Sequence, residues 1–399
     1  MRSEDDALWR YSLPATLLLL SPFDLLASLG MDMYLPVVPL MADVFSVDPV
    51  TIQWTLTTYL VLLGVGQLLF GPLSDRLGRR PILLGGGLSY AAASFALAAA
   101  PSSELFLAFR VLQGAGASAC LVATFATLRD IYAGREESRE VYGLLGSMLA
   151  MVPAAGPLLG AAVDHWLGWR AIFTCLGVAM ALAVIMAWRF WPETRRRQAS
   201  AISASALLLP LRRVHFWRYT LGYSAAMGSF FVFFSTAPWL MMERLALSSL
   251  AFSLWFATVA LAMMLTARVL GKLGGRYGVP RLLRTGMICL LAGGLLLALT
   301  ETLIPQSLFG FITPMWLVGI GIAITVSVTP NGALCGLDHI AGTATALYFC
   351  LGGLVLGGLG TLAVTLLPAY SAWPIVAYCL TLATAVLCLS WFKVSEEER

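Results

Sequence analysis

The chain has 399 residues, of which 59% are hydrophobic and only 12% are charged, and its mean hydropathy is +0.84. Because a soluble globular protein carries about 25% charged residues, this composition excludes an ordinary soluble domain and predicts an all-α polytopic membrane protein surrounded by lipid. A net charge of +4 gives no reason to expect a nucleic-acid partner.

Twelve apolar segments are long enough to cross a bilayer, since a spanning helix needs about 20 mostly apolar residues. In chain order they cover residues 13–37, 51–71, 81–100, 104–128, 141–163, 170–191, 218–240, 248–270, 282–301, 308–330, 340–367 and 372–392. Residues 1–10 are polar and acidic, and the first apolar segment lacks a small-residue cleavage site. We therefore expect no cleavable signal peptide, and that segment to remain as the first span.

One long polar stretch divides the spans into two sets of six. We expect an N-terminal half over residues 1–191, a cytoplasmic linker over 192–217 and a C-terminal half over 218–399. The loop after span 2 reads GPLSDRLGRRP (71–81), and the loop after span 8 reads GKLGGRYGVPR (271–281), with identities at a constant offset of 200 residues. This degraded repeat predicts two pseudo-symmetric six-helix halves, an architecture typical of secondary transporters.

Basic residues gather in the loops on one side of the predicted spans, whereas the opposite loops carry only Arg170 and Arg244. Because cytoplasmic loops are enriched in Lys and Arg, we expect both termini in the cytoplasm. The loop after span 10 is an exception, with Asp338 and His339 and no basic residue. The basic loops contain Arg76, Arg79, Arg80, Arg129, Arg135, Arg139, Arg195, Arg196, Arg197, Arg212, Arg213, Lys272, Arg276 and Arg281.

Span 1 contains two carboxylic acids, Asp24 and Asp32, and no basic residue between Arg10 and Arg76 can pair with them locally. Acids inside a membrane usually face a bundle interior or a water-filled cavity, and they often mark ion or proton paths. If span 1 covers 13–37, Asp24 lies near its middle and Asp32 lies about 12 Å nearer the outside. We expect Asp24 to serve the central exchange of proton and substrate.

Arg110 is a charged residue about a third of the way into span 4. An arginine stays protonated in proteins, so it must find an anion, carbonyl groups or water. Spans 1 and 4 thus supply opposite charges, and we expect Asp32 and Arg110 to form a coupled pair. The alternative is an Arg110 side chain that reaches the outer interface, which is less favourable because the residue lies more than one turn inside.

The loop at 71–81 combines two glycines, which permit tight turns, with an acid and several arginines that can form charge-assisted hydrogen bonds. We expect it to act as a latch that closes the cytoplasmic side, although an ordinary basic loop that only fixes topology would also fit. The latch residues are Gly71, Asp75, Arg76, Gly78, Arg79 and Arg80.

These stretches together resemble the major facilitator superfamily, in its twelve-span drug:proton antiporter group. GPLSDRLGRRP is similar to the signature of loop 2–3, and Arg110-Val111-Leu112-Gln113-Gly114 resembles the RxxQG signature of span 4. Residues 151–161 resemble the span 5 antiporter signature through Pro153, Gly156, Pro157 and Gly160, with Val152 and Ala161 where glycines are usual. Within this group, residues 27–36, 121–127, 230–238 and 324–329 resemble chloramphenicol and florfenicol exporters.

The resemblance implies proton-coupled export of phenicol antibiotics from the bacterial cytoplasm, through the inner membrane and by alternating access, in a protein that works as a monomer. A cavity with aromatic faces and a few polar groups suits a flat aromatic amide. The candidate cavity residues are Asp24, Tyr34, Tyr59, Gln113, Phe231, Phe234 and Tyr348, although helix packing alone would explain any one of these side chains.

Other functions remain open from the residues alone. A multidrug antiporter with broad substrates or a proton-coupled importer of a small metabolite would share these helices and charges, and a channel would need no alternating site. An enzyme is not expected, because the cysteines, histidines and acids form no catalytic or metal-binding cluster. Without a P-loop, ATP is not the expected energy source, and no cofactor is expected.

Overall fold

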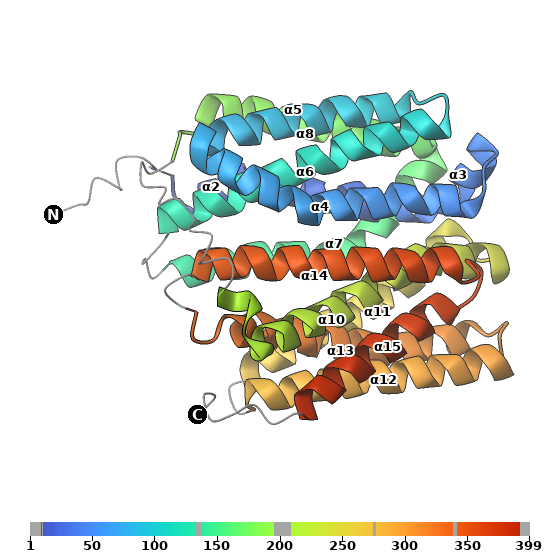
Figure 1. Cartoon of the computed structure of the whole chain (residues 1–399). Helices are drawn as coiled ribbons and strands as arrows, with labels where there is room; N and C mark the ends of the chain where they lie inside the picture. Colours follow the sequence, from blue (N-terminus) through green and yellow to red (C-terminus); the bar gives the residue numbers. More distant parts are fainter. Residues whose placement is uncertain are drawn as a thin grey trace. The chain divides into compact units, whose positions relative to one another are not determined.

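A computed structural model describes residues 9, 11–132, 137–194, 209–273, 277–337 and 341–391. The chain divides into two compact units, Met1–Ser200 and Ala201–Arg399 (Figure 1). Among these residues, twelve helices are long and apolar enough to span a membrane, which confirms the predicted number and the all-α fold class. Some residues that the sequence predictions name lie outside the described part of the chain. They are Arg135, Arg195, Arg196, Arg197, Arg276, Asp338 and His339.

In the first unit, span 1 is interrupted and each later span is one continuous helix. Span 1 consists of α2 (Leu13–Asp32), a short 3₁₀ turn η1 (Leu35–Val37) and α3 (Val38–Phe45). Spans 2 to 6 are α4 (Pro49–Leu77), α5 (Arg79–Ala98), α6 (Ser103–Tyr132), α7 (Ser138–Leu167) and α8 (Trp169–Phe190).

In the second unit, span 7 is α10 (Val214–Pro238), which continues into a π-helical turn η2 (Trp239–Arg244). Spans 8 to 12 are α11 (Ser249–Leu273), α12 (Val279–Leu303), α13 (Leu308–Leu334), α14 (Ala341–Leu366) and α15 (Trp373–Trp391).

The two units pack their helices in the same order. Span 1 (α2) lies against spans 4, 5 and 6, and span 7 (α10) lies against spans 10, 11 and 12. Span 3 packs on spans 4 and 6, as span 9 packs on spans 10 and 12, and spans 2 and 8 each pack on the fourth helix of their unit. The repeat that the loop sequences indicate therefore extends to the helix neighbours.

A pair of facing glycines brings the third and fourth helices of each unit into backbone contact. A β-carbon on Gly86 would lie 2.9 Å from the carbonyl oxygen of Gly116, and one on Gly116 would lie 2.6 Å from that of Gly86. In the second unit, the equivalent distances between Gly286 and Gly321 are 3.0 and 2.9 Å. Small residues at helix interfaces allow this close approach. Because the hydrophobic effect does not drive helices together in lipid, the van der Waals contacts of such close packing stabilise the helix pair instead.

Span 1 is longer than the predicted segment 13–37, because helical structure continues to Phe45 and the whole run covers 33 residues. The interruption follows the sequence, since Pro36 has no N–H to donate and the N–H of Tyr34 bonds to Met31 at 3.2 Å instead of to Gly30. The carbonyl group of Gly30 is thus left free for another donor.

The glycine contacts predict the effect of a single methyl group on stability. Gly86→Ala would place its β-carbon 2.7 Å from that of Ala119, whereas Gly85→Ala would meet nothing within 4 Å. We expect Gly86→Ala to destabilise the protein by about 1–3 kcal/mol and Gly85→Ala to leave stability unchanged or slightly higher. Thermal unfolding of the two purified variants in detergent tests this, and equal melting temperatures would contradict the packing argument.

Candidate functional site

Asp24 is fully buried on α2 and faces α6. Thr124 of α6 lies beside it, but the Thr124 hydroxyl donates to the carbonyl oxygen of Cys120 at 2.8 Å. Neither carboxyl oxygen of Asp24 has a hydrogen-bond partner of ordinary geometry within the described part of the chain. A buried acid without a fixed partner could bind and release a proton when its surroundings change.

Arg110 is also fully buried, with 0% of its surface exposed. Its Nη1 atom donates to the carbonyl oxygen of Gly30 at 2.9 Å and to Oε1 of Gln113 at 2.8 Å. The guanidinium carbon lies 4.7 Å from the ring centre of Tyr34 and 4.5 Å from that of Tyr59. Carbonyl groups and aromatic faces thus surround this permanent charge, and its Nε and Nη2 atoms have no hydrogen-bond partner in the described chain.

Two tyrosines hold the backbone of α2 between the two acids. The Tyr59 hydroxyl donates to the carbonyl oxygen of Ala27 at 2.5 Å, and the Tyr90 hydroxyl donates to that of Leu26 at 2.7 Å. Both hydroxyls lie over Gly30, where a β-carbon would be 2.7 Å from the Tyr59 oxygen. Glycine is therefore required at position 30, because any side chain there would displace the tyrosines.

Asp32 is the last residue of α2 and is 6% exposed. Helix α7 crosses it at Gly156, where a β-carbon would collide with the Asp32 side chain, and at Gly160, where one would lie 2.7 Å from the Met33 carbonyl carbon. Pro153 and Pro157 lie on the same helix without ending it. The span 5 signature thus places α7 directly on the interrupted part of span 1.

The expected pair of Asp32 and Arg110 is not formed in this structure. No carboxylate among the described residues lies within ion-pair distance of Arg110, which contacts Gly30 two residues before Asp32. Oδ1 of Asp32 is likewise unpartnered in the described part. The freed Gly30 carbonyl group explains the difference, since it offers Arg110 an acceptor that the sequence pattern did not reveal.

The length of span 1 also changes the depth assigned to the two acids. The midpoint of Leu13–Phe45 is residue 29, so Asp24 lies about 8 Å before it and Asp32 about 5 Å after it. The expectation that Asp32 lies about 12 Å nearer the outside than Asp24 stays a prediction. Both acids lie near the middle of this helical run.

The candidate residues in the second unit have different environments. Phe231 is buried over Gly360 of α14, where a β-carbon would be 2.5 Å from its ring. Phe234 packs edge-on against Phe256 of α11 at 5.7 Å between ring centres. Tyr348 donates from its hydroxyl to Thr329 at 2.8 Å. Phe231 is thus accounted for by packing within its own unit.

Residues 71–81, which were expected to form a loop, are helical apart from Gly78, because α4 ends at Leu77 and α5 begins at Arg79. They form a charged network within the first unit. Arg79 bridges Asp75 at 2.5 Å and Asp130, at the end of α6, at 2.9 Å. Glu193 accepts hydrogen bonds from the backbone N–H groups of Arg79 at 2.9 Å and Arg80 at 3.1 Å. Arg76 lies in the last turn of α4, and a β-carbon on Gly71 would meet nothing within 4 Å in the described structure.

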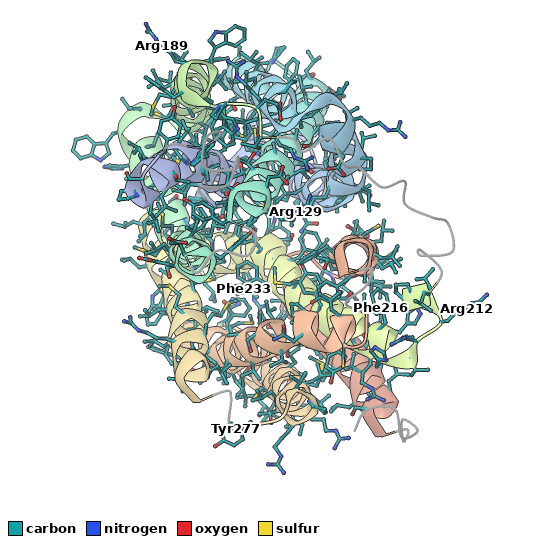
Figure 2. All side chains as sticks on the ribbon, turned by 90° about the vertical axis from the view of Figure 1, so that its left-hand side faces the viewer. Arg129, Arg189, Arg212, Phe216, Phe233 and Tyr277 are labelled. Atoms are coloured by element: carbon teal, nitrogen blue, oxygen red, sulfur yellow. The ribbon has the colours of Figure 1, made fainter. Side chains whose placement is uncertain are left out.

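Gly78 is required for that network. Its φ of +112° is a backbone conformation that favours glycine, and a β-carbon there would lie 2.9 Å from the Cδ atom of Glu193. The carboxylate of Glu193 therefore reaches the N-terminus of α5, where it satisfies two unpaired backbone donors and complements the helix dipole. Figure 2 looks onto this end of the first unit, where Arg129 and Arg189 also lie.

Sequence reasoning missed three polar residues around the buried charges, namely Tyr90 and Ser94 on α5 and Thr124 on α6. Tyr90 and Ser94 are one helical turn apart in an apolar span, which was a signal that could have indicated a shared polar face.

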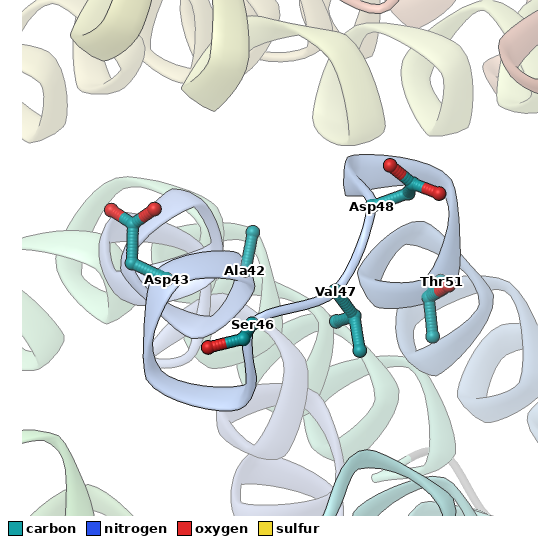
Figure 3. A pocket seen from close by; sticks show the side chains of 6 residues that line it. All are labelled: Ala42, Asp43, Ser46, Val47, Asp48 and Thr51. Carbon is teal, nitrogen blue, oxygen red and sulfur yellow. The ribbon is translucent and has the colours of Figure 1, made fainter.

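An open depression at the junction of α3 and α4 (Figure 3) lies apart from this site and is lined by Ala42, Asp43, Ser46, Val47, Asp48 and Thr51.

Two repeated six-helix units with charges buried in the first and fourth spans define a membrane transporter, not an enzyme. The sequence profile described as Major Facilitator Superfamily matches residues 23–361. The chain belongs to the Major Facilitator Superfamily and is a multi-pass membrane protein, and its bacterial relatives indicate the inner membrane.

Three comparisons locate the chain within that superfamily. It is 66% identical to a chloramphenicol resistance protein of Pseudomonas aeruginosa, over 96% of this chain and 91% of that protein. It is 29% identical to Multidrug resistance protein D of Escherichia coli K12, over 84% of each. A crystal structure of a peptide transporter in complex with sulfate has a TM-score of 0.76 over 94% of this chain and 92% of that chain, and its 14% identity shows the fold alone.

The contact between α7 and Asp32 generates a prediction about transport. Gly156→Ala would force its methyl group against the Asp32 side chain, whereas Gly146→Ala, on the same helix, would meet nothing within 4 Å. We expect Gly156→Ala to slow transport by roughly tenfold, the effect of about 1.4 kcal/mol, and Gly146→Ala to have no effect. Initial rates of substrate efflux at matched expression measure this, and equal rates for the two variants would refute it.

The Glu193 cap generates a prediction about the loop. Glu193→Gln keeps the shape of the side chain but removes the charge that complements two N–H donors at a helix N-terminus. We expect a loss of about 1 kcal/mol in stability, together with faster hydrogen exchange at the backbone amides of Arg79 and Arg80. Faster hydrogen exchange that is confined to other segments, with no change at the amides of Arg79 and Arg80, would contradict the role of Glu193 as a cap.

Proposed function

We propose that the protein exports phenicol antibiotics such as chloramphenicol and florfenicol from the bacterial cytoplasm in exchange for protons. The observation that carries this proposal is the presence of two buried acids on span 1, a helix that also accepts a hydrogen bond from the buried Arg110, in a chain 66% identical to a chloramphenicol resistance protein. Buried acids near the middle of a helical bundle are suited to proton exchange, because each conformation can offer them a different environment.

Asp24 is the group that we propose to exchange the proton. It has neither a cation nor a hydrogen-bond donor of good geometry in the described structure. Loss of that proton would leave a charge that needs a partner, and the hydroxyl or amide group of a drug could donate to it. Drug binding and proton release are thereby linked at one carboxyl group.

Asp32 and Arg110 form the second part of the proposed mechanism. Arg110 now donates to the carbonyl group of Gly30, which is close to Asp32 along the same helix. Ionised Asp32 would be a stronger acceptor than a carbonyl group, so Arg110 would turn towards it. The ionisation of Asp32 would then decide whether Arg110 stays hydrogen-bonded to the Gly30 carbonyl group near the end of α2. Proton movement would thereby be coupled to a conformational change in span 1.

The drug is proposed to contact aromatic and polar groups. Tyr34, Tyr59 and Gln113 of the first half surround Arg110, and Phe234 and Tyr348 are the proposed contributions of the second half. Phe231 is less suited than at first expected, because α14 covers its ring.

We further propose that both termini and the loop at 71–81 lie in the cytoplasm, where that loop acts as a latch. Arg129 and Arg189 lie at the end of the first unit that Figure 2 presents, and the enrichment of basic residues in cytoplasmic loops supports a cytoplasmic position for that end. The transporter is proposed to work as a monomer.

A broader multidrug antiporter is the second candidate. It is favoured by the 29% identity with Multidrug resistance protein D, which covers 84% of this chain. Resistance to unrelated cationic dyes or detergents in cells that express the protein would support it over a transporter restricted to phenicols.

Proton release from purified protein tests the role of Asp24. Addition of chloramphenicol to unbuffered detergent-solubilised protein should acidify the solution, and Asp24→Asn should reduce this release because a drug then meets no proton to displace. Asp48→Asn is a matched control, since it removes an exposed carboxyl group outside the buried site. Undiminished release from Asp24→Asn would remove Asp24 from the mechanism.

Growth of a drug-sensitive bacterium tests the proposed substrates. We expect expression of the chain to confer resistance to both chloramphenicol and florfenicol, and an uncoupler that dissipates the proton gradient to restore intracellular accumulation of both drugs. The uncoupler acts because export against a drug gradient needs the free energy of the proton gradient. Unchanged efflux in uncoupled cells would contradict proton coupling, and accumulation above the level in control cells would indicate an importer.

A further inference from the structure

Arg110 and Ser94 are joined by a chain of hydrogen bonds through Gln113. Arg110 donates to Oε1 of Gln113 at 2.8 Å, and Nε2 of Gln113 donates to the Ser94 hydroxyl oxygen at 2.8 Å. The Ser94 hydroxyl then donates to the carbonyl oxygen of Tyr90 at 2.7 Å. Arg110, Gln113 and Ser94 are each 0% exposed, so water cannot replace a lost partner.

We propose that Ser94 is a positioning residue of this transporter, which fixes the orientation of the Gln113 amide and through it the guanidinium of Arg110. This inference rests on the proposed proton-coupled function, because it assigns Ser94 a part in the coupling site. Ser94 itself contacts neither acid in the described structure and acts only through Gln113.

The direction of each hydrogen bond carries the argument. A serine hydroxyl has one proton, and that of Ser94 is used on the Tyr90 carbonyl group. Its oxygen can therefore only accept from the amide, so the NH₂ group of Gln113 faces Ser94 and Oε1 faces Arg110. The reversed amide would place its NH₂ group against a guanidinium that also has only donors.

This orientation matters because Arg110 has few acceptors. Only the Gly30 carbonyl group and Oε1 of Gln113 accept hydrogen bonds from it within the described structure. If the Gln113 oxygen turned away, Arg110 would lose one of the two and would turn more readily towards an ionised acid. Ser94 thus determines how strongly Arg110 stays at the end of α2.

The other charged or titratable groups around Arg110 are fixed by their own partners. Tyr34, which follows α2, bonds to Thr55, Tyr59 of α4 bonds to Ala27, and Tyr90 of α5 bonds to Leu26. The remaining titratable groups on α2 are Asp24 and Asp32, which are also the groups proposed to exchange protons. A change at Ser94 should therefore be detected in the pH dependence of proton release.

The test measures the pH at which drug-induced proton release is half-maximal in Ser94→Ala, Ser94→Thr and wild-type protein. We expect Ser94→Ala to lower this pH by about one unit, because a freer Arg110 turns more readily towards α2 and stabilises the ionised form of the carboxyl groups that exchange protons there. Ser94→Thr keeps the hydroxyl group and should restore the wild-type profile. Ser89→Ala is the matched control, since Ser89 is on the same helix and bonds only to Leu112 at 3.4 Å.

A double-mutant cycle separates positioning from simple stability. If Ser94 acts through Gln113, adding Ser94→Ala to Gln113→Leu should shift the pH profile no further than Gln113→Leu alone. Additive shifts would overturn the proposal, as would a Ser94→Ala variant that melts at a lower temperature but keeps the wild-type profile. Absence of drug-induced proton release in the wild-type protein would instead overturn the proposed function itself.

Discussion

The structure of the first unit depends on the need to accommodate a permanent charge away from water. A charged side chain inside a membrane helix is costly, and Arg110 has no carboxylate partner among the described residues to offset this cost. It is stabilised instead by the Gly30 carbonyl group, the Gln113 amide and two aromatic faces. Each of these partners has to be held in position by something else.

The surrounding packing supplies that support. The Gly30 carbonyl group is free because α2 is interrupted after Asp32, and the interruption has room because α7 presents glycines where it crosses. Tyr59 is kept over Arg110 by its own hydrogen bond to α2. The helix break, the glycines and the tyrosines therefore belong to one arrangement, and a change in the ionisation of Asp32 would act on all of them.

The sequence was sufficient for the parts of the structure that follow from hydropathy and from repeated motifs. Twelve spans could be predicted because the bilayer sets a minimum helix length, and the repeated loop indicated two similar halves. Asp24, Asp32 and Arg110 could be singled out because charges are rare in apolar segments. The partner of Arg110 could not be predicted, since a backbone carbonyl group has no signature in the sequence. Ser94 was missed for a related reason, because a serine in a membrane helix usually bonds to its own helix and only the packed structure reveals the second bond to Gln113.

The Glu193 cap determines which residues the first half of the chain needs for its complete structure. Glu193 follows the last residue of span 6, yet its carboxylate completes the start of span 3. The same tail lies against the N-terminal residues, since Trp191 packs edge-on against Trp9 with 5.8 Å between ring centres. A gene fragment cut directly after span 6 would leave α5 without its cap, so two halves made as separate polypeptides should be divided beyond Thr194. The boundary that serves for such a split gene is thus set by a hydrogen bond and not by the end of the last helix.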